Sequence, residues 1–303
     1  MTAEITVVVP HLRQWAQLDQ CLASLHHQTL ARGRFAVIVV DNGSPDFEDQ
    51  RHRLAGQWPD TVFTRESEPG PGPARNTGIA LASTPLIACI DADCVANERW
   101  LASALQALRQ AGPGTIHGGD VRIAMTNPAS PTAIEAYEAV FGFRQQLYIE
   151  KKHFTGTGNM AFWKSDFERT GPFAGIGQAE DRDWGNRAVR CGLRIAFMPD
   201  MIIFHPARPD FGALRQKWRR HVAHDLEAAR RSLPALMIWP IRAGAVALSA
   251  LPHLAMIWRS PHLRTVKARA RASGVLFRIR LFRAREMLRQ MALSKSEAGR
   301  WNR

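Results

Sequence analysis

The chain has 303 residues, of which 46% are hydrophobic and 22% charged, and this composition excludes a disordered or fibrous protein. The length suits one large domain, or a domain of about 200 residues with an appendage. The net charge of +13 is concentrated at one end, because residues 1–210 hold 20 Lys and Arg against 23 Asp and Glu, whereas residues 211–303 hold 20 against 4. The last third therefore predicts contact with an anionic surface, either lipid or nucleic acid.

Strands and helices are predicted to alternate along the first half of the chain. Apolar runs predict strands, apolar residues at helical spacing predict helices, and Gly, Pro and Asp clusters mark the turns. The expected strands are 5–10, 34–41, 61–67, 85–93 and 113–125. The expected helices are 12–28, 47–56, 71–82 and 97–112. Continuous apolar strands between helices favour a mostly parallel sheet covered on both faces, with ligands bound beyond the carboxyl ends of its strands.

The second half continues with fewer strands. A helical segment is expected over 128–150, then the Gly-rich stretch 153–167, a loop over 171–181, a helix over 183–192 and a strand over 194–205. After about residue 212 the composition becomes basic.

The cysteines and the N-terminus indicate the compartment. The four cysteines form no CxxC pair and no zinc spacing with His, so free thiols in a reducing compartment are expected. The first residues run into an apolar segment without a basic start or a cleavage site, so no secretory signal is predicted. The expected location is the cytoplasm.

Two acids, Asp91 and Asp93, end the apolar run of the fourth predicted strand. On a regular strand they would point to opposite faces, so a turn is needed for both to face one ligand, and residues 94–97 can supply it. Such oxygen ligands suit Mg²⁺ or Mn²⁺ held mainly by substrate phosphates. The alternative is that both are turn and helix-capping acids.

Six short motifs follow one another in order: Pro10 after the first strand, "VDNGSPD" (40–46), "ARNTG" (74–78), "DAD" (91–93), "GTGNMAF" (156–162) and "AED" (179–181). Over roughly residues 4–220 this series resembles glycosyltransferase family 2. The resemblance implies an α/β GT-A fold, which is a Rossmann-like, mostly parallel sheet flanked by helices. It also implies metal-dependent, inverting sugar transfer from a nucleotide-diphosphate donor to a hydroxyl acceptor.

The resemblance also implies a nucleotide and metal site. Asp41 matches the acid that contacts the base or ribose, Arg75 and Asn76 match the element near the phosphates, and Gly158 and Asn159 line the donor sugar unless they form a plain turn. The metal, Mn²⁺ or Mg²⁺, is expected on Asp93, Asp91 and His205, although a lone His is more often structural. The implied donor-binding set is Pro10, Asp41, Asn42, Ser44, Arg75, Asn76, Asp91, Ala92, Asp93, Gly158 and Asn159.

Glu180 and Asp181 match the family's E-D element, in which the Asp is the usual general base. Inverting transfer needs a carboxylate on the face opposite the departing diphosphate, where it accepts the proton of the attacking hydroxyl. The alternative is that Asp181 caps a helix starting near Asp183. The first loop, "PHLRQW", departs from the family's usual sequence, which leaves any contact of His11 with the nucleotide in doubt.

The basic last third predicts attachment to a membrane surface. The longest uncharged part of the apolar stretch 233–258 is shorter than the ~20 residues of a spanning helix, so a full span is not favoured. Within 277–291, apolar residues recur at helical spacing between arginines, which is typical of an amphipathic helix on anionic lipid. Two alternatives are a helix packed on the catalytic domain and contact with nucleic acid, for which no recognition motif is present. "RQKWRRH" (215–221) loosely resembles the Q-x-x-R-W element of processive synthases, although its arginines could equally meet phosphate or lipid.

These observations predict a GT-A catalytic domain over 1–212, with a nucleotide-binding half (1–95) and an acceptor half (96–212), and a basic helical tail over 213–303. The expected enzyme is peripheral on the inner membrane face and uses a saccharide or lipid-linked acceptor, without a nucleic-acid partner. One rival is a sugar-phosphate nucleotidyltransferase, which normally needs a Gly-rich loop that "VVVPHLRQW" lacks. Another is a non-catalytic membrane-binding module, which the intact acids speak against.

Overall fold

The computed structural model of the chain describes residues 3–176 and 179–293. It divides into two compact units, each described by itself. The first unit comprises residues 1–122 and 144–205, and the second unit comprises residues 123–143 and 206–303. All four cysteines lie within the described residues and are free thiols, as predicted.

Half of the eight-stranded sheet of the first unit is parallel. In the order β3-β2-β1-β4, the strands β1 (Ile5–His11), β2 (Phe35–Asp41), β3 (Thr61–Arg65) and β4 (Leu86–Ile90) pair in parallel. Every residue of β1 and β4 is buried, which explains why these strands are continuous apolar runs. The four strands predicted here are confirmed.

Beyond β4 the sheet becomes antiparallel, so it is mixed rather than mostly parallel. The remaining order is β7-β6-β8-β5, and β7 (Asn159–Trp163) pairs antiparallel with β4 and β6. β7 comes from the Gly-rich stretch, for which no strand was predicted. The other strands are β6 (Thr115–Ala124), β8 (Arg194–Pro206) and the two-residue β5 (Val95–Ala96).

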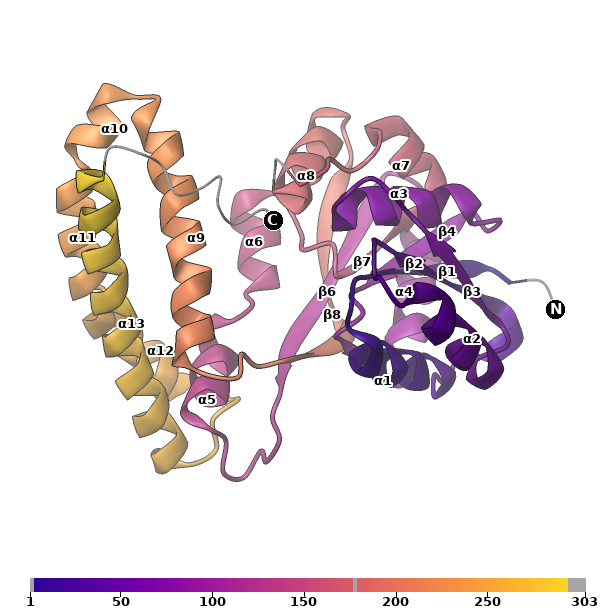
Figure 1. The fold of residues 1–303 in the computed structure, drawn as a ribbon, viewed down its shortest axis with the longest axis horizontal. Helices are drawn as coiled ribbons and strands as arrows, with labels where there is room; N and C mark the ends of the chain where they lie inside the picture. Colours follow the sequence, from indigo (N-terminus) through magenta and orange to yellow (C-terminus); the bar gives the residue numbers. More distant parts are fainter. Residues whose placement is uncertain (1–2, 177–178, 294–303) are drawn as a thin grey trace. The chain divides into compact units, whose positions relative to one another are not determined.

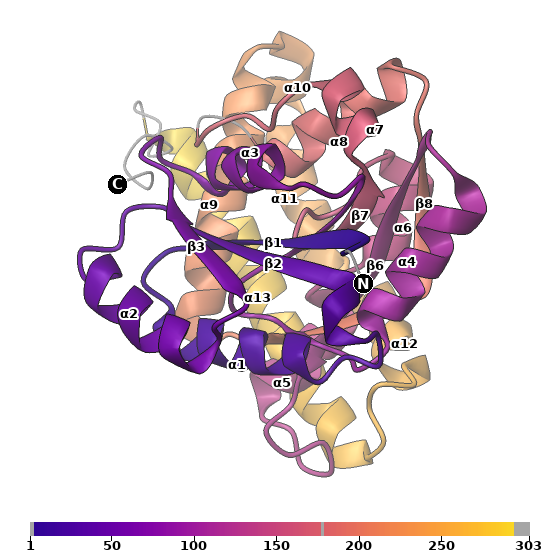
Figure 2. The same cartoon turned by 90° about the vertical axis from the view of Figure 1, so that its right-hand side faces the viewer.

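Helices cover both faces of this sheet (Figures 1 and 2). One face carries α3 (Pro71–Leu81), α7 (Lys164–Thr170) and α8 (Glu180–Arg190), and the other carries α1 (Trp15–His26) and α2 (Phe47–Gln57). The unit also contains α4 (Trp100–Ala111), α6 (Gln145–Lys152) and the short 3-10 helix η1 (Arg32–Arg34).

Helix α3 approaches the sheet closely because it carries glycine at the contact. A Cβ at Gly78 would lie 2.4 Å from Cγ1 of Val8 on β1, so any larger residue would push the helix away. The helix begins at Pro71, directly after Gly70 at φ +128°. This contact places Arg75 of the same helix beside the carboxyl end of β4.

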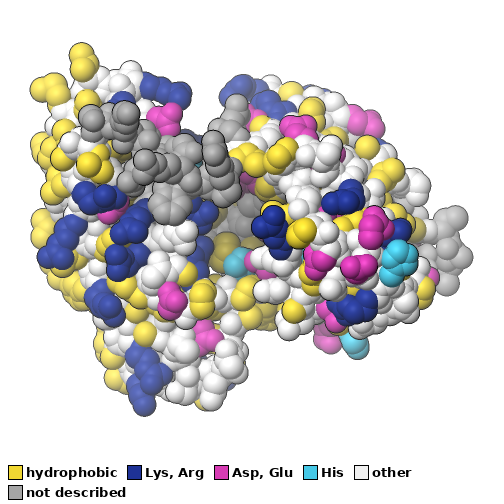
Figure 3. Space-filling view, in the orientation of Figure 1, with side chains coloured by type: hydrophobic (Ala, Val, Ile, Leu, Met, Phe, Trp, Pro, Cys, Tyr) yellow, Lys and Arg dark blue, Asp and Glu magenta, His cyan; other side chains and the backbone are white. Residues whose placement is uncertain are grey.

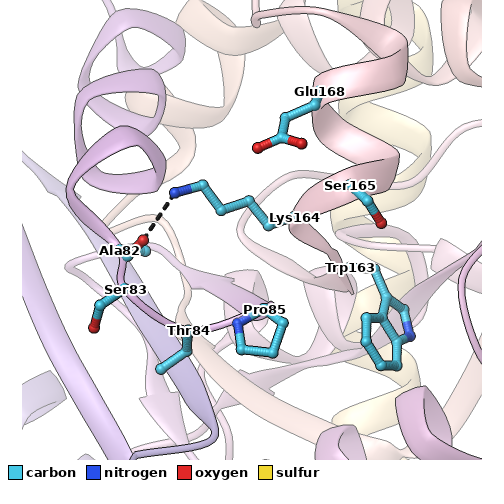
Figure 4. A pocket seen from close by; sticks show the side chains of 8 residues that line it. All are labelled: Ala82, Ser83, Thr84, Pro85, Trp163, Lys164, Ser165 and Glu168. Atoms are coloured by element: carbon cyan, nitrogen blue, oxygen red, sulfur yellow. Dashed lines mark hydrogen bonds between the residues drawn. The ribbon is translucent and has the colours of Figure 1, made fainter.

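A hollow of 360 Å³ lies at the opposite end of β4, between residues 82–85 and 163–168 (Figure 4). Lys164 donates from Nζ to the carbonyl oxygen of Ala82 at 2.8 Å, which satisfies a carbonyl at the C-terminus of α3. The hollow therefore belongs to the packing of α3 and lies away from the carboxyl edge that carries the motifs.

The second unit is a helical bundle with its own apolar core. It contains α5 (Ala133–Phe141), α9 (Phe211–Arg230), α10 (Leu233–Met237), α11 (Trp239–Leu248), α12 (Ala250–Arg259) and α13 (Val266–Ala292). Ile134 and Tyr137 of α5 pack with Leu276 and Ile279 of α13 in one cluster. Residues 123–143, expected in the catalytic domain, therefore belong by packing to the bundle, and the chain returns to it at residue 206 rather than 213.

Helix α13 confirms the predicted helix but not its predicted use. Of the expected lipid-facing residues, Phe277, Leu281, Leu288 and Met291 are exposed, whereas Ala284 is buried. Val275, Leu276 and Ile279 of the same helix are also buried in the bundle. The helix thus packs on its neighbours through one apolar face and exposes a second apolar face on the surface of the bundle. Sequence periodicity alone did not separate the two faces.

Residues Trp239–Arg259 are long and apolar enough, by composition alone, to cross a membrane, with a mean hydropathy of 1.3. In the structure they form α11 and α12, which meet at Ser249. Because 17% of this stretch is buried, most of it faces away from the core of the bundle.

Candidate active site

The acids that follow β4 sit in a tight turn. The backbone N–H of Cys94 donates to the carbonyl oxygen of Asp91 at 3.0 Å, so residues 91–94 form the turn themselves. The predicted turn at 94–97 is therefore too late along the chain, because Val95 and Ala96 already pair with β8. Ala92 is buried inside the turn, and the side chains of Asp91 and Asp93 keep 40% and 21% of their surface exposed.

Arg75 connects this turn to the start of α8. Its side chain is 2% exposed, donates from Nη2 to Oδ1 of Asp91 at 2.5 Å and lies 3.5 Å from Oε1 of Glu180. Burial lowers the pKa of Arg75, but the charges of Asp91, Cys89 and Glu180 raise it by more. The pKa of Arg75 therefore lies above its usual value. The guanidinium is thus a fixed positive charge between two carboxylates.

Gly158, in the loop before β7, lies directly against the side chain of Asp91. A Cβ at this position would lie 2.1 Å from Oδ2 of Asp91. Only glycine permits that approach, so Gly158 is needed for the Asp91 carboxylate to lie where it does, and its contact with the donor stays a prediction.

Asp93 and His205 could hold a divalent cation. Oδ2 of Asp93 lies 3.4 Å from Nε2 of His205, which comes from β8, and adjacent octahedral ligands at about 2.1 Å are about 3 Å apart. Asp91 keeps Oδ2 free of Arg75 on the same turn. The carboxylate suits Mn²⁺ or Mg²⁺, and the imidazole suits a transition-metal ion, so of the two predicted metals the residues fit Mn²⁺ better.

Cys94 lies within 4.8 Å of the ligand atoms of Asp93 and His205. Burial, followed by the charges of Asp91 and Asp93, raises the pKa of its thiol well above the usual value. The sulfur therefore stays protonated, and a protonated thiol is a poor ligand for a hard cation.

Helix α8 begins at Glu180, three residues before its predicted start, and its N-cap is Ala179. Asp181 is therefore a first-turn residue rather than the cap, and it accepts a hydrogen bond from the backbone N–H of Arg182 at 2.7 Å. Burial raises the pKa of both Glu180 and Asp181, and the nearby Arg75 partly offsets this. A carboxylate with a raised pKa is a stronger proton acceptor when ionised.

Asp41 closes the loop after β2 with both of its oxygens. Oδ1 accepts from Nδ1 of His11 at 2.9 Å, and Oδ2 accepts from the backbone N–H groups of Gly43 and Ser44 at 3.1 and 2.8 Å. The backbone N–H of Gln14 donates to Nε2 of His11, which assigns the ring proton to Nδ1. Burial raises the pKa of Asp41, but the hydrogen bonds from His11 and Ser44 lower it more.

In this structure the Asp41 carboxylate stabilises its own loop, and its expected contact with the nucleotide base or ribose stays a prediction. Its side chain is fully buried and its oxygens are already used. The signal for this pair was present in the sequence, because His11 and Asp41 each end a neighbouring parallel strand. Pro10 is buried beside them, and Oγ of Ser44 accepts from the backbone N–H of Arg13.

Two of the predicted amide ligands fix loops. Asn42 accepts from the backbone N–H of Gly70 and donates to the carbonyl oxygens of Glu66 and Glu68. Asn76 donates to the carbonyl oxygen of Phe173 and accepts from its N–H, both at 2.9 Å. Both position the loops around the site, and their expected contact with the donor stays a prediction.

Asn159 is likewise structural. It is fully buried, accepts from Nε1 of Trp100, and donates to the carbonyl oxygens of Asp120 and Met201. These bonds tie β7 to α4, β6 and β8. The expected contact of Asn159 with the donor sugar stays a prediction.

Comparison with a family model and with individual relatives indicates the same protein family. A family model described as glycosyl transferase family 2 matches residues 6–171. "Glycosyltransferase AglE" of Haloferax volcanii is 30% identical over 216 residues, which are 70% of each chain. "Validoxylamine A glucosyltransferase" of Streptomyces hygroscopicus subsp. jinggangensis is 36% identical over 117 residues, which are 36% of this chain and 26% of that one.

Among solved structures, the mannosyltransferase PcManGT from Pyrobaculum calidifontis, in complex with GDP-Man and Mn²⁺, has a TM-score of 0.56 and 22% identity, over 91% of this chain and 87% of that chain. Residues 1–349 of S. aureus TarS give a TM-score of 0.51 and 16% identity, over 96% and 93% of the two chains. At these identities the likeness concerns the fold, which is of the GT-A type.

Proposed function

Because the chain belongs to glycosyltransferase family 2 and is a glycosyltransferase, we propose that it transfers a sugar from a nucleotide-diphosphate donor to a hydroxyl acceptor with inversion. The observation that carries this proposal is that the buried Arg75 pairs with Asp91 and Glu180, while Asp93, on the same turn as Asp91, lies beside His205. This turn lies at the carboxyl edge of the sheet, where open α/β sheets bind their ligands.

On the donor side, Asp93, His205 and the free oxygen of Asp91 would hold Mn²⁺ or Mg²⁺. When bound, such a cation supplies Lewis-acid stabilisation of the negative charge on the departing diphosphate. The solved mannosyltransferase with GDP-Man and Mn²⁺ supports this choice. Arg75 holds Asp91 in place through its 2.5 Å hydrogen bond.

On the acceptor side, Asp181 is the proposed general base. The acceptor oxygen attacks the anomeric carbon, its proton passes to a carboxylate oxygen of Asp181, and the bond from carbon to the diphosphate oxygen breaks with its electron pair leaving on the diphosphate. Burial within the first turn of α8 raises the pKa of Asp181, which favours its acceptance of that proton. Glu180, paired with Arg75, positions the start of the helix.

The proposed place of action is the cytoplasmic face of a membrane, with a lipid-linked or saccharide acceptor. Residues 228–285 contain 12 Lys and Arg and no Asp or Glu. Apolar side chains stand exposed on the same helices, among them Leu233, Met237, Ile241, Leu248 and Leu251. Figure 3 shows hydrophobic side chains along the left-hand edge of the view, over α10 to α13, with Lys and Arg among them.

This combination favours an anionic lipid surface as the partner of the second unit. Apolar side chains can enter the headgroup boundary while arginines meet lipid phosphates. The apolar contact is assigned to α10–α12 together with the exposed face of α13, rather than to α13 alone. Protein–protein docking would not require a segment of this length free of acids.

A panel of nucleotide-diphosphate sugars tests the reaction. In the presence of Mn²⁺, one donor should raise the unfolding temperature and release its nucleoside diphosphate slowly by hydrolysis. A panel without stabilisation or turnover, measured on folded protein, would contradict sugar-nucleotide use.

A further inference from the structure

Cationic side chains of two helices gather around Trp218 in the second unit. Lys217 and Arg220 are three residues apart on α9 and so lie on one face of it. Arg283 of α13 lies over the indole ring of Trp218, with its Cζ 3.5 Å from the ring centroid, and Nζ of Lys217 lies 6.0 Å from the same centroid. We call Lys217, Trp218, Arg220 and Arg283 the cation cluster.

Two acids act on the cluster, but neither forms an ion pair with it in the described residues: Asp225, whose charge partly offsets the lowered pKa of Arg283, and Glu138. The nearest acid named around Lys217 is Glu138, but Arg208 already occupies both of its oxygens with its backbone N–H and Nη1. Among residues 3–176 and 179–293, no carboxylate lies within 4.0 Å of a charged nitrogen of Lys217, Arg220 or Arg283. Positive charges held this close repel one another unless an anion joins them.

The charge crowding has a measurable consequence for two members. Burial, together with Arg208, Arg220 and Arg283, lowers the pKa of Lys217 to about 8. Burial and the neighbouring Arg280 lower the pKa of Arg283 to about 10. A bound anion would stabilise the charged forms of both Lys217 and Arg283.

Two hydrogen-bond donors of the cluster are also unused. Nε1 of Trp218 and Nε of Arg283 are buried and have no hydrogen-bond partner. A buried donor without a partner is destabilising, so such groups in one cluster point to a missing acceptor.

We propose that the cation cluster binds a phosphate group and, resting on the glycosyl transfer proposed above, that this is the phosphate of the acceptor. Guanidinium, ammonium and indole N–H groups are all donors, and phosphate oxygens are acceptors only, which matches the unused groups of the cluster. The phosphate can be carried by a lipid or by a soluble molecule. The acceptor would thus be anchored through its phosphate on the second unit.

Isothermal titration of the full-length protein with inorganic diphosphate tests this site. The titration contains EDTA, so that the cation-dependent donor site does not contribute. We expect saturable binding that Lys217→Gln and Arg283→Gln each weaken about tenfold, as expected for the loss of one charge-assisted bond. Arg285→Gln, at an exposed arginine of the same helix, should bind like the unchanged protein.

The two sources of phosphate are separated by vesicles. Phosphatidylcholine vesicles containing phosphatidic acid are compared with vesicles that contain phosphatidylglycerol at equal charge. A preference for phosphatidic acid that Lys217→Gln abolishes identifies a lipid phosphomonoester, whereas binding of diphosphate alone identifies a soluble phosphate. Either result supports the site.

Three results would overturn the proposal. They are the absence of both diphosphate binding and phosphatidic acid preference, an equal loss in Arg285→Gln, or tighter binding of an oligonucleotide than of diphosphate. Arg283 packs on Trp218, so its loss could disturb the fold. Lys217 is half-buried, and the variant Lys217→Gln is therefore the one whose binding of diphosphate decides for or against the site. Stabilisation of the variants by a nucleotide sugar with Mn²⁺ is measured alongside, and its retention separates a failed phosphate site from a failed glycosyltransferase assignment.

Discussion

Asp181 is the residue on which the proposed chemistry depends most directly. Replacement by Asn keeps its size and its bond from Arg182 but removes the proton acceptor. Asp181→Asn should therefore retain donor binding in Mn²⁺ and lose transfer by about 10²- to 10⁴-fold. The matched control is Asp183→Asn on the same helix, which loses only a partly exposed ion pair with Arg187. Comparable turnover in Asp181→Asn and Asp183→Asn would rule out the assigned base.

The raised pKa of Asp181 predicts where activity falls on the acid side. A base works only when ionised, so kcat/KM should fall as the pH drops through its pKa, and burial moves that pKa above the ordinary value of about 3.9. A pH profile of kcat/KM should bend above pH ~4. Glu180→Gln, which removes the other raised carboxyl, should keep the bend, and its disappearance would assign the bend to Glu180.

Gly158 offers a test of the site's geometry. In Gly158→Ala the new Cβ would meet Oδ2 of Asp91 at 2.1 Å, so the carboxylate must move from its place. We expect donor stabilisation by Mn²⁺ to disappear, with little change in the unfolding temperature of the free protein. The control Gly33→Ala introduces a Cβ with nothing within 4 Å and should bind donor normally. Normal donor binding by Gly158→Ala would mean that donor binding does not require Asp91 in its present position.

Residue types explain which parts of the site could be predicted. Asp91, Asp93 and His205 were predicted as a metal set from the family resemblance, and in the structure Asp93 lies beside His205 while Asp91 pairs with Arg75 on the same turn. The sequence did not reveal the loop contacts of Asn42 and Asn159, because an amide can bind a ligand or tie two loops and only the folded partners show the second role. The Asp41 carboxylate likewise accepts bonds from His11 and from its own loop.

At the scale of elements, the Asn159 side chain adds to the backbone pairing of β7 by bonding to α4, β6 and β8. Asn159→Ala would leave Nε1 of Trp100 and two carbonyl oxygens unpaired in a fully buried position. It should lower the free energy of unfolding by about 3 kcal/mol, measured by urea denaturation. Asn97→Ala, which loses one exposed bond to Arg99, should cost less than about 1 kcal/mol. A change in donor affinity without a change in stability would instead indicate that Asn159 acts in the donor site.

The elements that could be predicted are those whose local pattern is unambiguous. The parallel strands β1, β2 and β4 are buried apolar runs bounded by turns, and the edge strand β3 is a short β-branched run; all four were found. β7 was not predicted because it directly follows the glycines at 156 and 158, so the whole stretch was taken for a Gly-rich loop. The start of α8 was placed late because Glu180 and Asp181, taken for site residues alone, also form its first turn.

At the scale of the whole molecule, exposed apolar side chains on basic helices predict binding to anionic vesicles. Ile241 is 73% exposed, so Ile241→Glu should leave the fold intact and weaken cosedimentation with phosphatidylglycerol vesicles about tenfold. Val62→Glu, at a 53% exposed residue of the edge strand β3, is the matched control. Salt should weaken binding of the unchanged protein. Equal vesicle binding by the two variants would remove α11 from the membrane contact.

The division of the chain into two units was only partly readable from the sequence. The charge step near residue 211 indicated a separate C-terminal segment. Residues 123–143 gave no such sign, because they join the bundle through the apolar face of α5, with Ile134 and Tyr137 against α13. A contact between segments this far apart in the chain leaves no local pattern.

The central claim is that a divalent cation and a nucleotide-diphosphate sugar meet at the turn after β4. The most direct measurement is the anomalous diffraction of a crystal soaked with Mn²⁺ and the donor identified by the panel. The account predicts a manganese peak in contact with Asp93 and His205, bridging to the donor phosphates. A nucleotide and a manganese ion bound elsewhere, with Asp91, Asp93 and His205 contacting neither, would contradict it.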